Sequence, residues 1–160
     1  MTLEDSAEKI YRNPLYRAEI YRIACGALHT VVLLSNGEVF TFGCNDEGAL
    51  GRKGTEYVPM KVDLEDPVDL ISAGDNHSLF ANSVNGAVYF TGNYNFQRGE
   101  KMTDSVMEPI KFFTSDIDVR NKDKPIQKLA SGANHSVIMV DGKLYCRGEP
   151  EAYTIGRRVN

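Results

Sequence analysis

Three histidines are the residues of this chain whose spacing most suggests chemistry. His29, His77 and His135 each follow a glycine at the same distance, and they lie roughly 50 residues apart, the period of a repeated structural unit. A metal site would need the three imidazoles to converge on one ion, whereas equivalent residues of successive repeats are spread apart in space. We therefore interpret the histidines as structural hydrogen-bonding groups, and we expect neither a metal nor a cofactor.

The sequence lacks the local motifs that carry covalent chemistry. No Ser/His/Asp or Cys/His arrangement has its usual context, and no glycine-rich phosphate-binding motif follows a strand and opens a helix. Three cysteines lie far apart and form no CxxC pair, which indicates neither a disulfide framework nor a zinc knuckle. We expect no catalytic residues, no bond-making activity and a reducing compartment.

Composition and charge exclude two further classes of function. The formal net charge of −4 disfavours binding to nucleic acid by bulk electrostatics. No apolar run reaches the roughly 20 residues that a membrane span needs, and the polar N-terminus does not resemble a signal peptide. We expect a soluble intracellular protein that does not contact a membrane.

Each histidine lies in a longer repeat that the chain contains three times. The repeats read IACGALHTVVL at 23–33, ISAGDNHSLFA at 71–81 and LASGANHSVIM at 129–139. A short β-prone run between glycines follows each of them: GEVFTFG, GAVYFTG and GKLYCRG. The two runs are joined through AsnGly, AsnGly and AspGly, which favour tight hairpin turns. Each unit is therefore predicted to contain a β-hairpin.

Further elements extend the hairpins. The glycine-rich loop NDEGALGR at 45–52 is echoed by AYTIGR at 152–157, and the middle unit lacks it. PMKVDL at 59–64 and EPIKFF at 108–113 each read as an outer strand opened by proline, a residue that is tolerated at sheet edges. At the N-terminus, LEDSAEKIYRN is compatible with a short helix, but NPLYRAEIYRIACG resembles an outer strand and linker, which we favour.

These elements predict an all-β fold made of about three four-stranded blades of a β-propeller. Residues 1–20 would form an N-terminal extension or outer strand. The three repeats would occupy about 21–67, 68–125 and 126–160.

GCNDEGALGR at 43–52, SAGDNH at 72–77 and ASGANH at 130–135 resemble the regulator of chromosome condensation family. The resemblance covers about residues 14–157 and implies a seven-bladed propeller, of which this chain would supply about three blades. Three blades do not close a ring. The remaining blades would come from the same gene in cis, from another copy or from another chain.

The resemblance also implies a function. Members of the family that act on the small GTPase Ran speed guanine-nucleotide exchange at chromatin, by stabilising the nucleotide-free GTPase without breaking a covalent bond. The expected partners are a Ran-like small GTPase and, in addition, the nucleosome or chromatin. The expected location is the nucleus, with the cytoplasm as the alternative.

Several positions would form the GTPase-binding face that the resemblance implies. Asp46 would offer its carboxylate to the GTPase, or else accept a backbone hydrogen bond within its own turn. Phe96 stands where the family usually has an acidic residue, which counts against full exchange activity. The remaining candidates are the tips of the histidine repeats: Leu28, His29, Asp75, Asn76, His77, Asn134 and His135.

Two other groups of residues have roles by resemblance. The segment 112–124 falls where the family exchange factor has a β-wedge that is pushed against the nucleotide site, and a solvated surface loop is the alternative. Its tip would be formed by Ile117, Asp118 and Val119. Chromatin contacts would use the clustered basic residues Arg52, Lys53, Arg157 and Arg158.

A second class of function uses the same face without exchange. A non-catalytic interaction module, or an inactive fragment of a longer propeller protein, would bind another protein and release no nucleotide. Phe96 and the missing blades favour this alternative, whereas the wedge and the acidic face favour exchange.

Overall fold

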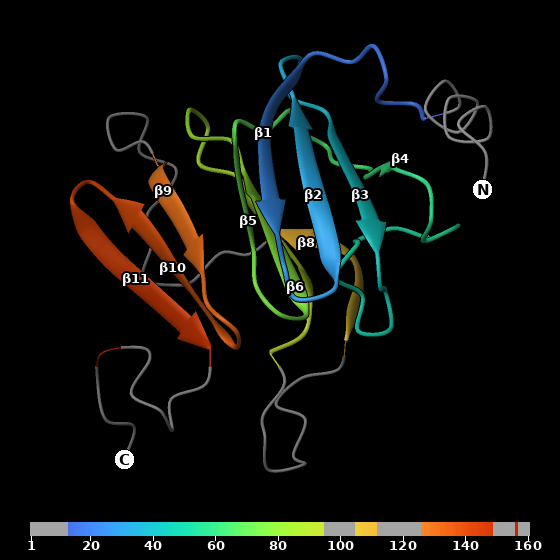
Figure 1. Cartoon of the computed structure of the whole chain (residues 1–160). Helices are drawn as coiled ribbons and strands as arrows, with labels where there is room; N and C mark the ends of the chain where they lie inside the picture. Colours follow the sequence, from blue (N-terminus) through green and yellow to red (C-terminus); the bar gives the residue numbers. More distant parts are fainter. Residues whose placement is uncertain (1–12, 95–104, 112–125, 149–155, 157–160) are drawn as a thin grey trace.

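The computed structural model describes residues 13–94, 105–111, 126–148 and 156. These residues form three antiparallel sheets that follow one another along the chain (Figure 1). The first sheet contains β1 (Ile20–Cys25), β2 (His29–Leu34), β3 (Val39–Gly43) and β4 (Met60–Lys61). The second contains β5 (Leu70–Ala73), β6 (His77–Ala81), β7 (Val88–Gly92) and β8 (Val106–Lys111). The third contains β9 (Ile126–Ser131), β10 (His135–Val140) and β11 (Lys143–Gly148).

The arrangement confirms the prediction of an all-β protein made of propeller blades. Within each sheet the strands are joined in sequence order, and the first strands β1, β5 and β9 contact one another in turn. The sheets therefore pack as successive blades, with their first strands innermost (Figure 1). No helix of the described part of the chain is long and apolar enough to cross a membrane.

The predicted hairpins are present in all three blades. β2 pairs with β3, β6 with β7 and β10 with β11, each in a continuous antiparallel register. The turn of the third hairpin has positive φ at both Asp141 and Gly142, 51° and 69°, as its AspGly sequence predicts. Local turn chemistry therefore sets the register that places each histidine at the start of its second strand.

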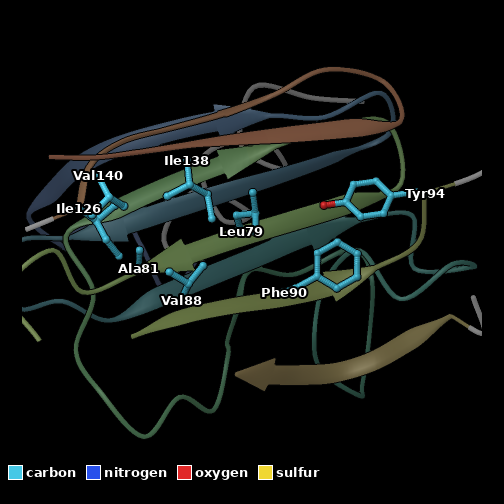
Figure 2. Packing of buried hydrophobic residues seen from close by; sticks show 8 residues of the cluster. All are labelled: Leu79, Ala81, Val88, Phe90, Tyr94, Ile126, Ile138 and Val140. Carbon is cyan, nitrogen blue, oxygen red and sulfur yellow. The ribbon is translucent and has the colours of Figure 1, made fainter. Parts of the chain in front are cut away.

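Two apolar layers hold the blades together. Between the first and second blades, Val31, Leu33 and Val39 pack against Phe80 and Tyr89. Between the second and third blades, Figure 2 shows a similar layer in which strands β6 and β7 face strands β9 and β10. Its members are Leu79, Ala81, Val88, Phe90, Tyr94, Ile126, Ile138 and Val140. Burying one such aliphatic or aromatic side chain contributes about 1.5–3 kcal/mol, so these layers supply most of the free energy that holds the blades together.

Two details differ from the sequence predictions. β8 begins at Val106 rather than at the predicted proline, and Pro109 lies inside the strand at a register shift opposite β7. A bulge leaves residues out of the ladder, so proline's missing N–H costs no hydrogen bond there. At the N-terminus, residues 14–17 form a turn instead of the favoured strand, and Leu15 packs on Val32 and Leu34 of the first blade.

Candidate functional site

Each repeated histidine is positioned by two glycines. A Cβ on Gly74 would lie 2.0 Å from Cε1 of His77, and a Cβ on Gly92 would lie 2.1 Å from the carbonyl oxygen of Asn76. The first and third blades have the same arrangement, at Gly26 and Gly43 and at Gly132 and Gly148. The glycines of the sequence motif therefore make room for the imidazole ring and for the backbone that carries it.

The histidines join neighbouring blades. Nε2 of His29 lies 2.9 Å from Oγ of Ser78 in the second blade, and Nε2 of His77 lies 2.9 Å from Oγ of Ser136 in the third. The hydroxyl of Ser78 donates to the carbonyl oxygen of Ala49, so it accepts from the Nε2–H of His29. We call these contacts interblade histidine bonds. They confirm the structural interpretation of His29 and His77.

Burial keeps these histidines neutral. Burial lowers the pKa of His77 to about 3, and the charges of His29 and His135 act in the same direction. Burial also lowers the pKa of His29, against the opposing effect of a backbone hydrogen bond to His77. A neutral imidazole at these positions is suited to holding blades together and offers no accessible base for catalysis.

The three repeat tips lie side by side at one end of the blades. The amide of Asp75 donates to the carbonyl of Ala133 at 3.2 Å, which ties the second tip to the third. Amides after the third strands bind the tips from outside: Cys44 donates to Leu28, and Asn93 donates to Asn76. We call this end of the molecule the loop face. It comprises residues 26–28, 44–51, 74–76 and 132–134.

A structured loop presents Asp46 on the loop face. Asn45 accepts a hydrogen bond from the amide of Leu50 through its side-chain oxygen and donates to the carbonyl of Arg52. The side-chain turn bonds that were the alternative role for Asp46 are therefore made by Asn45. The carboxylate of Asp46 is exposed.

Glu47 is an acidic residue of the loop face that the sequence analysis did not single out. Its carboxylate accepts a hydrogen bond from Ser105 Oγ at 2.6 Å and lies 3.4 Å from Nδ2 of the fully buried Asn93. These contacts join the loop of the first blade to the second blade. In the sequence, only the position of Glu47 next to Asp46 could have indicated that it belongs to this face.

The exposed part of the loop face is apolar and acidic. Leu28 is 70% exposed, Asp75 is exposed, and Asn76 and Asn134 are half-buried. His77 is fully buried and His29 nearly so, which corrects their assignment to the contact surface because their rings are enclosed between blades. His135 is half-buried at the edge of the third blade.

Of the two described basic candidates for chromatin contact, Arg52 is buried and Lys53 is exposed. Arg52 is only 6% exposed, and its guanidinium donates to the backbone carbonyls of Thr41 and Thr55 at 2.7 and 2.9 Å. This corrects its assignment as a chromatin contact, since its guanidinium donors are used to hold its own loop. Lys53 is exposed and forms a surface ion pair with Glu108 at 3.0 Å.

Several predicted site residues lie outside the described part of the chain. They are Phe96, the wedge residues Ile117, Asp118 and Val119, and the basic residues Arg157 and Arg158. Among the residues that the structure does describe, no group of three histidine, cysteine or acidic side chains is placed to hold a metal ion.

Comparisons with known proteins agree with this geometry. Two family models, both described as Regulator of chromosome condensation (RCC1) repeat, match residues 36–81 and 20–49. The Regulator of chromosome condensation of Mus musculus is 39% identical over 144 residues, which cover 87% of this chain and 33% of the mouse protein. The X-linked retinitis pigmentosa GTPase regulator of Canis lupus familiaris is 32% identical over 84% of this chain and 13% of the dog protein.

A solved structure extends the comparison to the fold. Prp20p from Saccharomyces cerevisiae matches with a TM-score of 0.76 and 28% identity over 92% of this chain and 36% of the yeast chain. The yeast structure is described together with the binding properties of that protein to Gsp1p and histones. This chain thus spans about a third of the length of the mouse and yeast relatives.

Proposed function

Because the chain belongs to the regulator of chromosome condensation (RCC1) repeat family, we propose that it binds a Ran-like small GTPase through its loop face and speeds release of the guanine nucleotide. The observation that carries this proposal is the single rim of adjoining repeat tips, from which Leu28, Asp46 and Asp75 project into solvent. Such a surface offers apolar contact together with acceptors for basic side chains.

The chemistry of exchange suits a surface of this kind. The chain forms and breaks no covalent bond with the nucleotide; it binds the nucleotide-free GTPase more tightly than the loaded form, which shifts the population toward release. Acidic side chains at the rim would pair with basic residues of the GTPase and raise the association rate. The same proposal places the protein in the nucleus, with chromatin as a second partner.

Chromatin binding requires basic side chains that are accessible. Lys53 is the described candidate that remains, because Arg52 is buried. The histone binding described for the yeast relative supports this part of the proposal.

A second function, a binding module without exchange activity, is favoured by two observations. The chain spans only about a third of its mouse relative, and it also matches a protein of another name, the X-linked retinitis pigmentosa GTPase regulator, over 84% of its length. Phe96 in place of the usual acidic residue is consistent with binding that is not followed by release.

Binding through the loop face can be tested with two charge reversals. Asp46→Lys alters an exposed carboxylate on the loop face, whereas Asp63→Lys alters an exposed carboxylate that follows β4 at the opposite end of the blade. Affinity for nucleotide-free Ran, measured by biolayer interferometry, should fall about tenfold or more in Asp46→Lys, because a repelling charge enters the contact. Equal affinities of the two variants would overturn the proposed face.

A further inference from the structure

The turn that carries Asp46 also carries a second carboxylate, which is used inside the protein. The amide of Gly48 donates to the carbonyl oxygen of Asn45 at 2.9 Å, so Asp46 and Glu47 are the two central residues of a hydrogen-bonded turn. Asp46 is exposed, whereas Glu47 is half-buried and its carboxylate contacts the second blade. One turn therefore presents one acidic side chain to solvent and holds the other within the molecule.

Two groups of this turn are fixed to the second blade. Oε2 of Glu47 accepts a hydrogen bond from Oγ of Ser105 at 2.6 Å, and the carbonyl oxygen of Gly48 accepts one from Oγ1 of the fully buried Thr91 at 2.7 Å. A Cβ on Gly48 would lie 2.6 Å from the carbonyl oxygen of Val106, so the backbone of the turn packs closely on the start of β8. We call these two hydrogen bonds the turn clamp.

Asn93 connects the turn clamp to the tip of the second blade. Its side-chain Nδ2 lies 3.4 Å from the carboxylate of Glu47, and its backbone amide donates to the carbonyl oxygen of Asn76 at 2.8 Å. Asn93 directly follows β7 and is fully buried, so it has little freedom to move on its own. One connected set of contacts thus lies beneath both exposed carboxylates, Asp46 on the turn and Asp75 on the tip.

Fixing the turn in the free protein favours binding. A loop that becomes ordered only on contact with its partner loses conformational entropy at that step, which lowers the affinity. A turn that is already clamped loses little more, so its exposed carboxylate can contribute fully to the contact. A carboxylate suits the clamp, because a hydrogen bond to a charged acceptor is stronger than one to a neutral group.

We propose that Glu47 is a positioning residue of the loop face. Through the turn clamp it holds Asp46 at a fixed place relative to Asp75, so that both carboxylates meet basic side chains of one GTPase without further ordering. Glu47 itself makes no contact with the GTPase, and this separates its role from that of Asp46. The identity of the partner rests on the proposed function, whereas the clamp is a property of the free chain.

Amide hydrogen exchange in the full chain alone tests the clamp. In Glu47→Ala, the amides of Gly48 and Leu50, which donate within the loop, should exchange about tenfold faster or more, because one hydrogen bond to a charged acceptor is lost. Glu47→Gln keeps an acceptor for Ser105 and should retain most of the protection. Glu65→Ala is the matched control, since it removes an exposed carboxylate elsewhere in the chain, and it should leave both amides unchanged.

The affinity for nucleotide-free Ran tests the link to binding. Glu47→Ala should lower this affinity about threefold or more, but it should have little further effect in a chain that already carries Asp46→Ala, because Glu47 acts through Asp46. Unchanged amide exchange, a wild-type affinity in Glu47→Ala, or equal losses of affinity in the two backgrounds would overturn the positioning role. Faster exchange in a chain that does not bind Ran would support the clamp and contradict the proposed function.

Discussion

The interblade histidine bonds require a specific protonation state of single residues. His29 donates from Nε2 to a hydroxyl that is itself a donor to the carbonyl of Ala49, and His77 is enclosed at the equivalent place between the second and third blades. A protonated ring at either position would place a charge in a site with no carboxylate hydrogen-bonded to it. The residue chemistry therefore links blade docking to pH.

Acidification should unfold the protein through His77. Its folded pKa is about 3 and the unfolded value is 6.5, so between these values the unfolded chain binds more protons and stability falls as pH falls. Each pH unit costs about 1.4 kcal/mol for one such residue, or about 2 kcal/mol between pH 6.5 and about pH 5. Burial of His29 acts in the same direction.

Urea unfolding of the wild type and of His77→Gln at several pH values checks this prediction. Glutamine retains a donor for Ser136 but does not titrate, so the variant should lose less stability than the wild type over the same pH interval. A variant that loses as much stability as the wild type would show that His77 is not the titrating group.

Removing one hydroxyl should also weaken the docking of two blades. In Ser78→Ala, the buried Nε2–H of His29 loses its acceptor, which should lower the free energy of unfolding by about 1–3 kcal/mol. Ser35→Ala is the control, because its hydroxyl forms an exposed contact with the carbonyl of Glu19 and its loss should cost less than about 0.5 kcal/mol. Denaturant unfolding measures both, and similar losses would contradict a role for the interblade bond.

At the scale of elements, strand pairing depends on glycines, and the structure requires glycine either for a positive φ alone or for a positive φ together with close backbone packing. Gly92 ends β7 with φ of 98° and lies against the backbone of Asn76, whereas Gly142 has φ of 69° in an open turn with nothing within 4 Å of a Cβ. The two positions share the strain of positive φ but differ in the space available. Substitutions at these two positions therefore separate the energetic cost of positive φ from the cost of a steric clash.

Substitution by alanine should show that difference. Gly142→Ala should cost about 1–2 kcal/mol from backbone strain alone. Gly92→Ala adds a clash with the Asn76 carbonyl and should cost at least about 2 kcal/mol more, because the backbone must move to relieve it. Thermal unfolding of both variants measures the difference in stability. Equal losses of stability would mean that the tip at Asn76 moves aside at no energetic cost.

The elements themselves could largely be predicted from sequence. Each hairpin follows from an apolar run, a tight turn and a second run, all of which are local features. The start of β8 was misplaced because a proline usually opens an edge strand, and only the register shift opposite β7 lets Pro109 lie inside it. The turn at 14–17 was also missed, since its reason is the packing of Leu15 on a neighbouring strand.

The site was less predictable, because it depends on contacts between blades. The repeated HisThr or HisSer pairs are visible in the sequence, but the bond from His29 to Ser78 requires two blades to be placed side by side. For the same reason His77 and Arg52 were assigned to the surface, although a neighbouring blade encloses the first and its own loop encloses the second. Asp46 and Asp75 lie in exposed loops, as local sequence predicts, and their contact with a GTPase stays a prediction.

At the scale of the whole molecule, the three blades place their repeat tips side by side in one rim. A hydrogen bond from the amide of Asp75 to the carbonyl oxygen of Ala133 joins the second and third tips of this rim. The chain spans about a third of the length of its mouse relative, and the proposed exchange function is tested on this chain itself.

The most direct test is the rate at which a fluorescent GDP analogue leaves Ran in the presence of the full chain and excess unlabelled nucleotide. We expect release to accelerate about tenfold or more as the chain is added, and we expect Asp46→Lys but not Asp63→Lys to reduce the acceleration. Release that stays at the intrinsic rate of Ran at every concentration of the chain would contradict the exchange function.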